Sequence, residues 1–174
     1  KAIQLREKDL SGKDLFLLAE KICKLCQAYH ATLFINDRVD VALSIDAAGV
    51  QLSKTSLPVA TARALLGSQK NIGVSTHSLQ EAREAEQNGA DFILFGPVYF
   101  TASKAAYGDP QGLLTLKTIV DNVSLPVYAI GGIIPENTKS TKNIGVRGVA
   151  LISAIVSAES PKKAAEQVLR ELRS

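Results

Sequence analysis

Short apolar runs alternate with longer amphipathic stretches from one end of the chain to the other. The short runs are rich in Val, Ile, Leu and Phe and predict strands at 3–5, 32–35, 49–52, 71–74, 92–95, 127–130 and 149–152. The stretches between them place apolar residues at helical spacing and predict helices at 12–29, 38–44, 58–66, 78–88, 112–122, 135–143 and 161–172. Strands and helices that alternate in this way are typical of a parallel β/α fold.

Residues at two helix ends support this pattern. Ser11 directly precedes the first predicted helix, where a hydroxyl can accept a hydrogen bond from a free backbone N–H group. Ser78 and Glu81 have the spacing of a capping box, and Gly89 follows the end of the same helix. The sequence therefore predicts where at least two helices begin.

The predicted strands show little alternation of apolar and polar residues, which is typical of a parallel sheet covered on both faces. Polar or glycine residues follow the carboxyl ends of the strands: Arg6 and Lys8, Asn36 and Asp37, Ser75 and His77, Gly96, Gly131 and Gly132, and Ser153. In a (β/α)₈ barrel all these ends meet at one mouth, whereas a doubly wound sheet uses only the strands at its switch point. The sequence contains no Gly-x-Gly-x-x-Gly motif after the first strand and no Walker motif, either of which would favour the open sheet. We therefore expect an α/β fold, a TIM (β/α)₈ barrel in one domain over residues 1–174, with seven readable strands and the first β/α unit missing.

Composition narrows the class of protein. The chain has 174 residues, 46% of them hydrophobic and 21% charged, enough for one globular core. No apolar run approaches the roughly 20 residues that span a bilayer, and no signal-peptide core follows Lys1, so we expect a cytoplasmic protein without a membrane segment. The net charge of +3, the 5% of aromatic residues and the absence of Trp argue against nucleic acid and for a small anionic substrate.

Cys23 and Cys26 form a Cys-x-x-Cys pair, a spacing found in redox and metal sites. They lie inside a predicted amphipathic helix, and the chain has no second cysteine pair. We therefore expect buried or half-buried structural thiols.

Two segments carry the chemistry of an anion site. Gln4, Arg6 and Lys8 stand at alternate positions, so on a strand they would share one face and offer an amide, a guanidinium and an ammonium to a pyrophosphate. The alternative is a solvated turn after an edge strand. The second segment is Gly131-Gly132, where backbone N–H groups can approach a ligand; the alternative there is a tight turn without a ligand.

A further hydroxyl supports the second segment, because Ile152-Ser153 ends the last predicted strand beside a helical turn. Loops after the last two strands of a barrel often bind phosphate. The two loops together predict a phosphate site.

In these features the chain resembles the thiamine-phosphate synthases and their relatives, the thiazole tautomerases, over nearly its whole length. The segments that carry the resemblance are 4–8, 36–40, 73–78, 89–91, 95–98, 101–104, 129–133 and 149–154. The resemblance implies a transferase of thiamine biosynthesis that joins hydroxymethylpyrimidine pyrophosphate to a (carboxy)thiazole phosphate and releases pyrophosphate. Its partners would be these two small substrates, and a homo-oligomer stays open.

The resemblance also implies roles for single residues. Five residues would bind the pyrophosphate, with Arg6 and Lys104 as the catalytic cations: Gln4, Arg6, Lys8, Asn36 and Lys104. Asp37 would bind Mg²⁺, and Ser75 would contact the pyrimidine. The thiazole phosphate would be contacted by Thr101 and Ser103 and cradled by Gly131, Gly132, Ile152 and Ser153. Two of these residues also have structural interpretations. Asp37 could cap the helix that begins near residue 38, and Lys104 could be a loop cation.

One position departs from the pattern of the synthases, which have a second metal-binding Asp in a Gly-x-His-x-Gly-Gln-x-Asp segment. This chain has Ser56 at that position, and a hydroxyl is a weaker ligand for Mg²⁺ than a carboxylate. Either Asp37, waters and substrate phosphates hold the ion, or the chain is not a synthase. The combination of Gln51-Leu52 with Ser56 is similar to that of the tautomerases.

The tautomerase interpretation needs a residue that moves a proton on a carboxythiazole phosphate. His77 is the candidate, because an imidazole titrates near neutral pH, although it could instead bond the following turn. Lys8, Asn36, Asp37 and Lys104 favour the synthase, since proton transfer alone does not need a pyrophosphate and metal set. A non-catalytic ligand sensor is a third alternative, and the sequence has no basic patch or recognition helix to support it.

Overall fold

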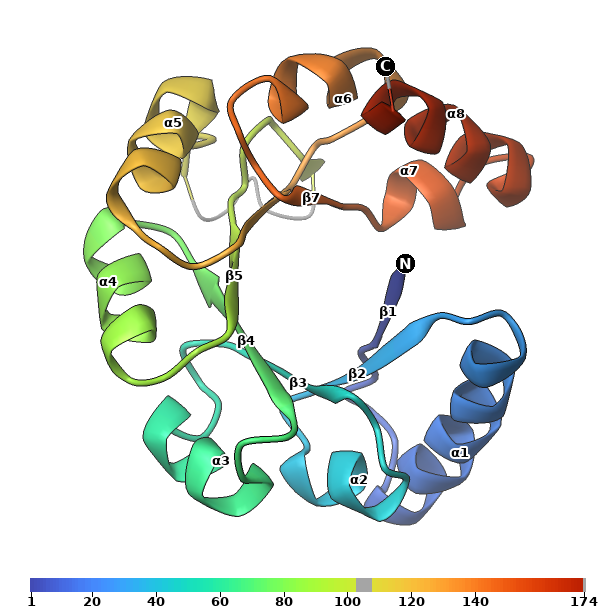
Figure 1. Cartoon of the computed structure of the whole chain (residues 1–174). Coiled ribbons are helices and arrows are strands. Elements are labelled where there is room, and N and C mark those ends of the chain that lie inside the picture. Colours follow the sequence, from blue (N-terminus) through green and yellow to red (C-terminus); the bar gives the residue numbers. More distant parts are fainter. Residues whose placement is uncertain (103–107, 174) are drawn as a thin grey trace. The chain divides into compact units, whose positions relative to one another are not determined.

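The computed structural model describes residues 1–102 and 108–173, in which strands and helices alternate along the chain (Figure 1). The strands are β1 (Ala2–Leu5), β2 (Thr32–Asn36), β3 (Gly49–Leu52), β4 (Asn71–Thr76), β5 (Phe92–Phe95), β6 (Val127–Ile130) and β7 (Gly148–Ala150). The helices are α1 (Gly12–Ala28), α2 (Val39–Ser44), α3 (Val59–Leu66), α4 (Leu79–Gln87), α5 (Gly112–Asn122), α6 (Pro135–Lys142), α7 (Ser153–Val156) and α8 (Pro161–Arg173). Every predicted strand and helix is present.

The last strand differs from its predicted extent. It ends at Ala150 instead of residue 152, because Ile152 has a φ of −124° and a ψ of −84°, outside the β region, and precedes the short helix α7. The helical turn expected beside Ser153 is therefore an element of its own.

The chain divides into two compact units. Lys1–Ser75 and Gln87–Asp91 form the first, and Thr76–Glu86 together with the chain from Phe92 onward forms the second. The units are interleaved along the sequence, because the five residues Gln87–Asp91, which begin at the last residue of α4, belong to the first unit while the segments on both sides belong to the second.

The first unit holds β1 to β4 as parallel neighbours in sequence order. The registers align Ile35 of β2 with Val50 of β3, and Val50 with Ile72 of β4, and all three side chains are fully buried. Leu15 and Ala19 of α1 and Ala62 of α3 belong to the same buried cluster, so these helices pack against this face.

The opposite face of the same strands is polar. Gln4 aligns with Phe34, and Asn36 aligns with Gln51 and through it with Gly73. Side chains two positions apart lie on one face, so the amides of Gln4, Asn36 and Gln51 share this second face. The expectation of little alternation is therefore wrong for these strands, because in strands of four to six residues the aromatic and glycine residues on the second face hide its period of two.

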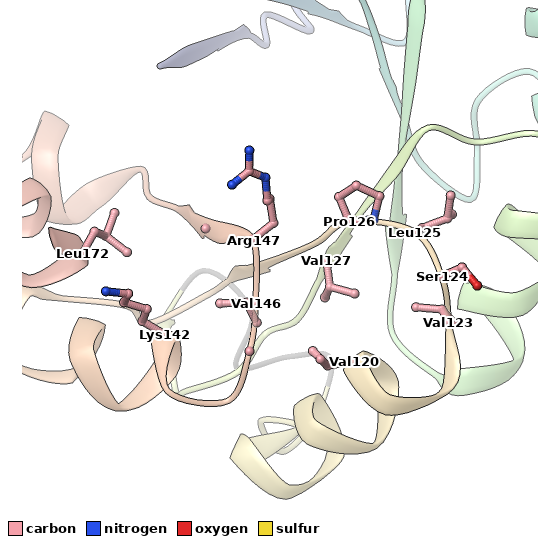
Figure 2. Close-up of a pocket in the computed structure, with 12 residues that line it drawn as sticks. Val120, Val123, Ser124, Leu125, Pro126, Val127, Lys142, Val146, Arg147 and Leu172 are labelled. Carbon is pink, nitrogen blue, oxygen red and sulfur yellow. The ribbon is translucent and has the colours of Figure 1, made fainter. Parts of the chain in front are cut away.

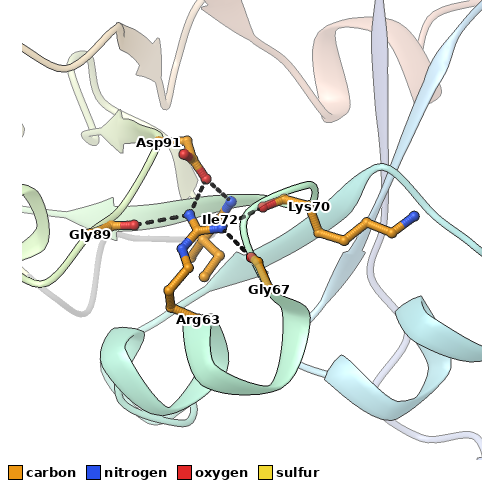
Figure 3. Close-up of polar contacts among 6 residues, drawn as sticks. All are labelled: Arg63, Gly67, Lys70, Ile72, Gly89 and Asp91. Atoms are coloured by element: carbon orange, nitrogen blue, oxygen red, sulfur yellow. Dashed lines mark hydrogen bonds and ion pairs between the residues drawn. The ribbon is translucent and has the colours of Figure 1, made fainter.

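The segment Gln87–Asp91 is tied to the first unit by Arg63 of α3 (Figure 3). The Arg63 guanidinium donates to the carbonyl groups of Gly67, Lys70 and Gly89 at 2.9, 2.7 and 3.0 Å, and pairs with the Asp91 carboxylate at 2.5 Å. Asp91 Oδ2 also accepts from the N–H group of Ile72 at 2.6 Å. One side chain thus joins α3, the loop before β4 and the segment before β5.

The second unit holds β5, β6 and β7 as parallel neighbours. Phe95 and Ala129 align across β5 and β6, and both are fully buried, as are Leu116 and Ile119 of α5. At the carboxyl ends of the strands the backbones approach closely, since a Cβ atom on Gly96 would lie 2.0 Å from the carbonyl oxygen of Ile130. Only glycine fits there.

The predicted helix caps and cysteine environment are confirmed. Ser11 Oγ accepts from the N–H of Asp14 at 3.2 Å, and Ser78 Oγ accepts from that of Glu81 at 3.1 Å. Cys26 is buried and Cys23 half-buried, and neither forms a disulfide. Burial raises the pKa of the Cys26 thiol above its ordinary value, and Cys23 adds to this shift, which suits a structural thiol.

Residues 1–102 and 108–173 contain no helix that is long and apolar enough to cross a membrane.

Candidate functional site

A row of hydrogen bonds joins three of the predicted site residues in the first unit. Gln4 Nε2 donates to Asn36 Oδ1 at 3.0 Å, and Asn36 Nδ2 donates to Asp37 Oδ2 at 2.7 Å. Gln4 lies on β1, and Asn36 and Asp37 lie at the carboxyl end of β2. Each amide in the row therefore has a fixed orientation, and the row ends on a carboxylate.

Asp37 has an unusual backbone conformation, with a φ of 60° in the left-handed region. Asp and Asn tolerate this region better than most other residues, but it still carries strain. The Asp37 N–H donates to the carbonyl of Gln51 at 3.0 Å, which holds the turn against β3. The turn directs the carboxylate toward Asn36 and the loop after β3.

Hydroxyl groups from that loop surround the other oxygen of the carboxylate. Ser56 Oγ donates to Asp37 Oδ1 in a short hydrogen bond, and Ser53 Oγ lies 3.5 Å from the same oxygen. Ser53 and Ser56 are themselves linked, with their hydroxyls 2.9 Å apart and the Ser53 N–H donating to Ser56 Oγ at 2.6 Å. At the position where the synthase pattern has a carboxylate, this chain has a hydroxyl that donates a hydrogen bond to Asp37.

The alternative in which Asp37 caps the following helix is wrong. The residue that precedes α2 is Arg38, and α2 has no side-chain cap. The Asp37 oxygens accept from Asn36, Ser53 and Ser56 instead. The carboxylate is therefore not used to begin a helix.

Ser75 lies on the polar face of β4, as the sequence predicts for a residue near the substrate. Its Oγ accepts from Gln51 Nε2 at 3.1 Å, and Gln51 is 3% exposed. The buried Gln51 amide thus holds the Ser75 hydroxyl in one orientation.

Arg6 and Lys8 do not lie on the strand with Gln4. β1 ends at Leu5, and the Glu7 carboxylate accepts from the N–H groups of Lys8 and Asp9 at 2.9 and 3.4 Å, which turns the chain. The expectation that strand alternation places Arg6 and Lys8 on the face of Gln4 is therefore wrong. Both side chains are exposed and make no hydrogen bond or ion pair with the residues that the structure describes.

The oxygen donors around Asp37 fit one type of metal site. Mg²⁺ is commonly held by one or two carboxylates together with waters and substrate phosphates. Asp37 supplies one carboxylate, and Ser53 and Ser56 supply neutral oxygens. Within the described part of the chain no three His, Cys, Asp or Glu side chains cluster as a metal site. The donor set therefore fits a Mg²⁺ ion only if a phosphate-bearing substrate completes its ligands.

In the second unit, His77 is held by the end of β5. Its Nδ1 lies within hydrogen-bond distance of the Gly96 carbonyl, and a carbonyl can only accept, so Nδ1 carries a proton in this contact. Its backbone N–H donates to Glu81 Oε2 at 2.7 Å. Glu81, the acidic residue of the capping box, thus holds the backbone of His77, and Gly96 holds its ring.

Gly131 and Gly132 follow the carboxyl end of β6 with φ values of 95° and 64°, which favour glycine. A Cβ atom on Gly131 would lie 2.5 Å from that of Pro97, and one on Gly132 would lie 2.4 Å from the carbonyl oxygen of Phe100. Close approach of two backbone segments therefore requires both glycines.

Ser153 and Ile152 follow the neighbouring strand β7, and both are exposed. Ile130 aligns with Ala150, so the glycine pair and Ser153 come after the same ends of adjacent strands. Thr101 is half-buried and has an interaction partner. The predicted contacts at Ser103 and Lys104 lie outside the described residues.

A cavity of about 640 Å³ in the second unit is separate from these residues (Figure 2). Its walls include Pro126 and Val127 at the start of β6, and Arg147 and Gly148 at the start of β7. The candidate residues follow the opposite, carboxyl ends of these strands. The cavity is therefore not part of the candidate site.

Comparison with known proteins identifies the family. A family model described as thiamine monophosphate synthase matches residues 1–155. The chain is also 47% identical to a putative thiamine-phosphate synthase of Geobacter sulfurreducens over 169 residues. This match covers 97% of this chain and 79% of the relative. The chain belongs to the thiamine monophosphate synthase family. It is also similar to the thiamine-phosphate synthase of Clostridium beijerinckii, with 42% identity over 97% of this chain and 80% of that protein.

Solved structures confirm the fold class expected for this family. The thiamine phosphate pyrophosphorylase from Pyrococcus furiosus superposes with a TM-score of 0.91 at 38% identity, over 99% of this chain and 82% of that one. A 3-hexulose-6-phosphate synthase with 18% identity has a TM-score of 0.73 and shows the same fold. The predicted family, the parallel α/β fold of the TIM-barrel type and the transferase class of the thiamine-phosphate synthases are thus confirmed.

The sequence analysis did not select Ser53, whose hydroxyl lies 3.5 Å from Asp37 Oδ1, or Asn137, whose Nδ2 donates to the Gly132 carbonyl at 3.0 Å. Ser53 follows β3, so the rule that selected Asn36 and Ser75 after their strands could have found it. Asn137 lies inside the first turn of α6, and its sequence position gives no such signal.

Proposed function

We propose that the chain catalyses the coupling of hydroxymethylpyrimidine pyrophosphate with a thiazole phosphate to give thiamine phosphate and pyrophosphate. The thiazole nitrogen forms a bond to the pyrimidine methylene carbon, and the bond from that carbon to the pyrophosphate oxygen breaks. The attacking nitrogen carries no proton, so the reaction needs no general base. The main task is to stabilise negative charge on the leaving group.

In the first unit, the pyrophosphate would be bound by Gln4, Asn36, Arg6 and Lys8. The observation that carries this assignment is the row from Gln4 through Asn36 to Asp37, in which hydrogen bonds orient two amides and a carboxylate in advance. Arg6 and Lys8 are exposed cations without partners in the described residues, so they are available to an anion. Lys104 would add a further cation.

Mg²⁺ would be held by Asp37 together with the substrate, and would neutralise charge on the leaving pyrophosphate. Ser56 donates a hydrogen bond to Asp37 Oδ1, so its hydroxyl would have to release that oxygen for an ion to bind there.

In the second unit, the thiazole phosphate would be bound by the loop at Gly131 and Gly132 and by Ser153, with contacts from Thr101, Ser103 and Ile152. Ser75 would contact the pyrimidine from the first unit, with its hydroxyl fixed by Gln51.

The experiment incubates the full chain with both phosphorylated substrates and Mg²⁺ and follows thiamine phosphate by chromatography. Asp37→Asn keeps the size of the side chain and removes its charge, and we expect at least a roughly hundredfold fall in coupling rate, because charge stabilisation is the main catalytic contribution. Asp9→Asn is the matched control on an exposed carboxylate outside the row, with an unchanged rate expected. Equal rates for wild type and Asp37→Asn contradict the assignment of Asp37.

A second candidate function, isomerisation of a carboxythiazole phosphate, is favoured by one observation. The Nδ1–H group of His77 bonds to the Gly96 carbonyl, so Nε2 is the ring nitrogen that remains for proton exchange with a substrate. This function predicts isomerisation by the wild-type chain, its loss in His77→Ala, and no thiamine phosphate from the coupling assay. Coupling that survives in His77→Ala supports the synthase. A chain that binds both ligands and converts neither is a sensor.

A further inference from the structure

Asn137 connects two parts of the glycine loop through one side chain. Its Nδ2 donates to the carbonyl oxygen of Gly132 at 3.0 Å, and its Oδ1 accepts from the N–H group of Ile134 at 2.9 Å. The second bond is ordinary helix capping, since Ile134 directly precedes α6 and Asn137 is at its third position. The first bond serves no helix, because Gly132 lies two residues before the cap.

The bond to Gly132 completes a pattern along the loop. The carbonyl of Ile130 accepts from the N–H of Val98 at 2.9 Å, and the carbonyl of Gly131 accepts from the N–H of Tyr99 at 3.0 Å. With Asn137 on Gly132, three successive carbonyl groups are occupied. By contrast, no hydrogen bond in the described part of the chain uses the N–H groups of Gly132 and Ile133. A loop whose acceptors are occupied and whose donors are free attracts an anion.

Buried hydroxyls hold Asn137 itself in place. Thr141 Oγ1 donates to the Asn137 carbonyl at 2.8 Å, and Thr138 Oγ1 donates to the Ile134 carbonyl at 2.8 Å. Both threonines are fully buried. Tyr99 Oη lies 3.0 Å from Thr141 Oγ1, so the segment that covers the glycine loop is joined to the same turn of α6.

We propose that Asn137 is a positioning residue for phosphate binding, which turns the Gly132 carbonyl away from the ligand and presents the N–H groups of Gly132 and Ile133 to it. This inference rests on the proposed function in one respect, that the anion bound here is the thiazole phosphate. It does not need Asn137 to touch the substrate.

The two hydrogen bonds of Asn137 can be separated by substitution. Asn137→Asp keeps an oxygen that accepts from Ile134 and removes the donor to Gly132, so helix capping is retained and the loop contact is lost. A carboxylate in the first turn of a helix is also favourable for the helix. Asn137→Ala removes both bonds without adding charge. Lys139→Gln changes the net charge by the same amount as Asn137→Asp, on an exposed position of the same helix.

The first measurement is a titration of the full-length protein with inorganic phosphate, followed by the ¹⁵N–¹H signals of Gly132 and Ile133. We expect these two signals to shift in the wild type and in Lys139→Gln with similar affinity. In Asn137→Asp and Asn137→Ala we expect phosphate affinity to fall by about fivefold or more, the equivalent of one hydrogen bond. Thermal unfolding of Asn137→Asp should stay near that of the wild type.

The second measurement is the KM for each substrate of the coupling reaction. We expect Asn137→Asp to raise the KM for the thiazole phosphate by about fivefold or more and to leave the KM for the pyrimidine pyrophosphate unchanged. If Asn137 had only a structural role, its substitution would lower the fraction of active enzyme and would not raise the KM for one substrate more than for the other.

The results separate the two proposals. If the wild type makes no thiamine phosphate but phosphate shifts Gly132 and Ile133 in a manner that depends on Asn137, the proposed function fails and this inference stands. Phosphate that leaves both signals unmoved, or an affinity that is the same in wild type and Asn137→Asp, overturns the inference. A fall in affinity as large in Lys139→Gln as in Asn137→Asp also overturns it, because charge alone then explains the effect.

Discussion

Asp37 accepts hydrogen bonds on both of its carboxylate oxygens, and the type of neighbour at each oxygen determines how it can bind a metal. Asn36 fixes Oδ2, and Ser56 and Ser53 occupy Oδ1. A hydroxyl in contact with a carboxylate satisfies it without adding charge, which stabilises the site when no ion is bound. We infer that this chain stabilises its site without metal at some cost in affinity for Mg²⁺.

Replacing Ser56 with Asp tests this balance. Two carboxylates in contact repel each other, so we expect Ser56→Asp to lower the Tm by about 2–4 °C without Mg²⁺, the equivalent of about 1 kcal/mol. With Mg²⁺ added, the two carboxylates share an ion, and the Tm should rise above that of the wild type under the same conditions. The measurement is thermal unfolding with and without MgCl₂.

Ser56→Ala is the control for this variant, because it removes the same hydrogen bond without adding charge. Its Tm should not depend on Mg²⁺ more strongly than that of the wild type. A Tm of Ser56→Asp that is indifferent to Mg²⁺ would show that Asp37 is not a metal ligand.

Arg63 gives a stability prediction. It donates to three carbonyl groups and pairs with Asp91, and its side chain is 25% exposed. Its removal leaves these acceptors partly unsatisfied, so we expect Arg63→Ala to lower the free energy of unfolding by about 2–3 kcal/mol in chemical denaturation. Arg83→Ala, on an exposed arginine with one bond to Asn122 at 3.1 Å, should cost less than about 1 kcal/mol. Equal losses in the two variants would contradict this role of Arg63.

The sequence indicates the types of residue at the site better than their contacts. Polar residues after strand ends identified Asn36, Asp37 and Ser75, because the ends of parallel strands have a fixed position in the fold. The bond from Ser56 to Asp37 joins residues 19 positions apart, and Arg63 and Asp91 are 28 positions apart. Local patterns carry no information on pairs this distant, so these contacts could not be predicted.

At the scale of the elements, the backbones of two strands approach each other closely at the carboxyl ends of β5 and β6. Gly96 packs against the carbonyl of Ile130, and its own carbonyl accepts from His77. Its position therefore sets both the separation of two strands and the orientation of the histidine.

Gly96→Ala tests this constraint. The new Cβ atom would lie 2.0 Å from a backbone oxygen, so the strands must separate, and we expect a loss of about 2 kcal/mol or more in the free energy of unfolding. Gly148→Ala is the matched control on the neighbouring strand β7, where the new atom meets only the Tyr128 ring at 3.1 Å. Because a ring can move more readily than a backbone, this variant should lose less. Denaturant titrations of both variants give the comparison, and a larger loss in Gly148→Ala contradicts it.

Element boundaries show which sequence signals are dependable. Capping residues gave the start of α1 and α4 correctly, because a cap acts within one turn of the helix. β1 ends at Leu5, as predicted, but its alternation does not continue to Arg6 and Lys8, because the Glu7 side chain accepts from the backbone N–H of Lys8 and turns the chain there. The polar face of β1 to β4 was missed because Phe34, Gly49 and Gly73 interrupt it.

At the scale of the whole molecule, the prediction of one domain over residues 1–174 can be tested by the cooperativity of unfolding. The chain passes from one compact unit to the other three times, at the boundaries near residues 75, 86 and 91. Neither unit is a continuous stretch of sequence, which disfavours independent folding. We expect one transition in guanidinium chloride that coincides when followed by far-UV circular dichroism and by tyrosine fluorescence. Two separated transitions would contradict a single domain.

The Arg63 contacts have a practical consequence for cutting the gene into two fragments that reassemble. A cut after Ser75 follows the first boundary but separates Arg63 from Asp91 and Gly89, two of the groups that satisfy its guanidinium. A cut after Asp91 keeps this arginine and its partners on one polypeptide. Fragments 1–91 and 92–174 should therefore restore a split reporter more efficiently than fragments 1–75 and 76–174, since only the second pair must rebuild the ion pair of Arg63 with Asp91 between two chains.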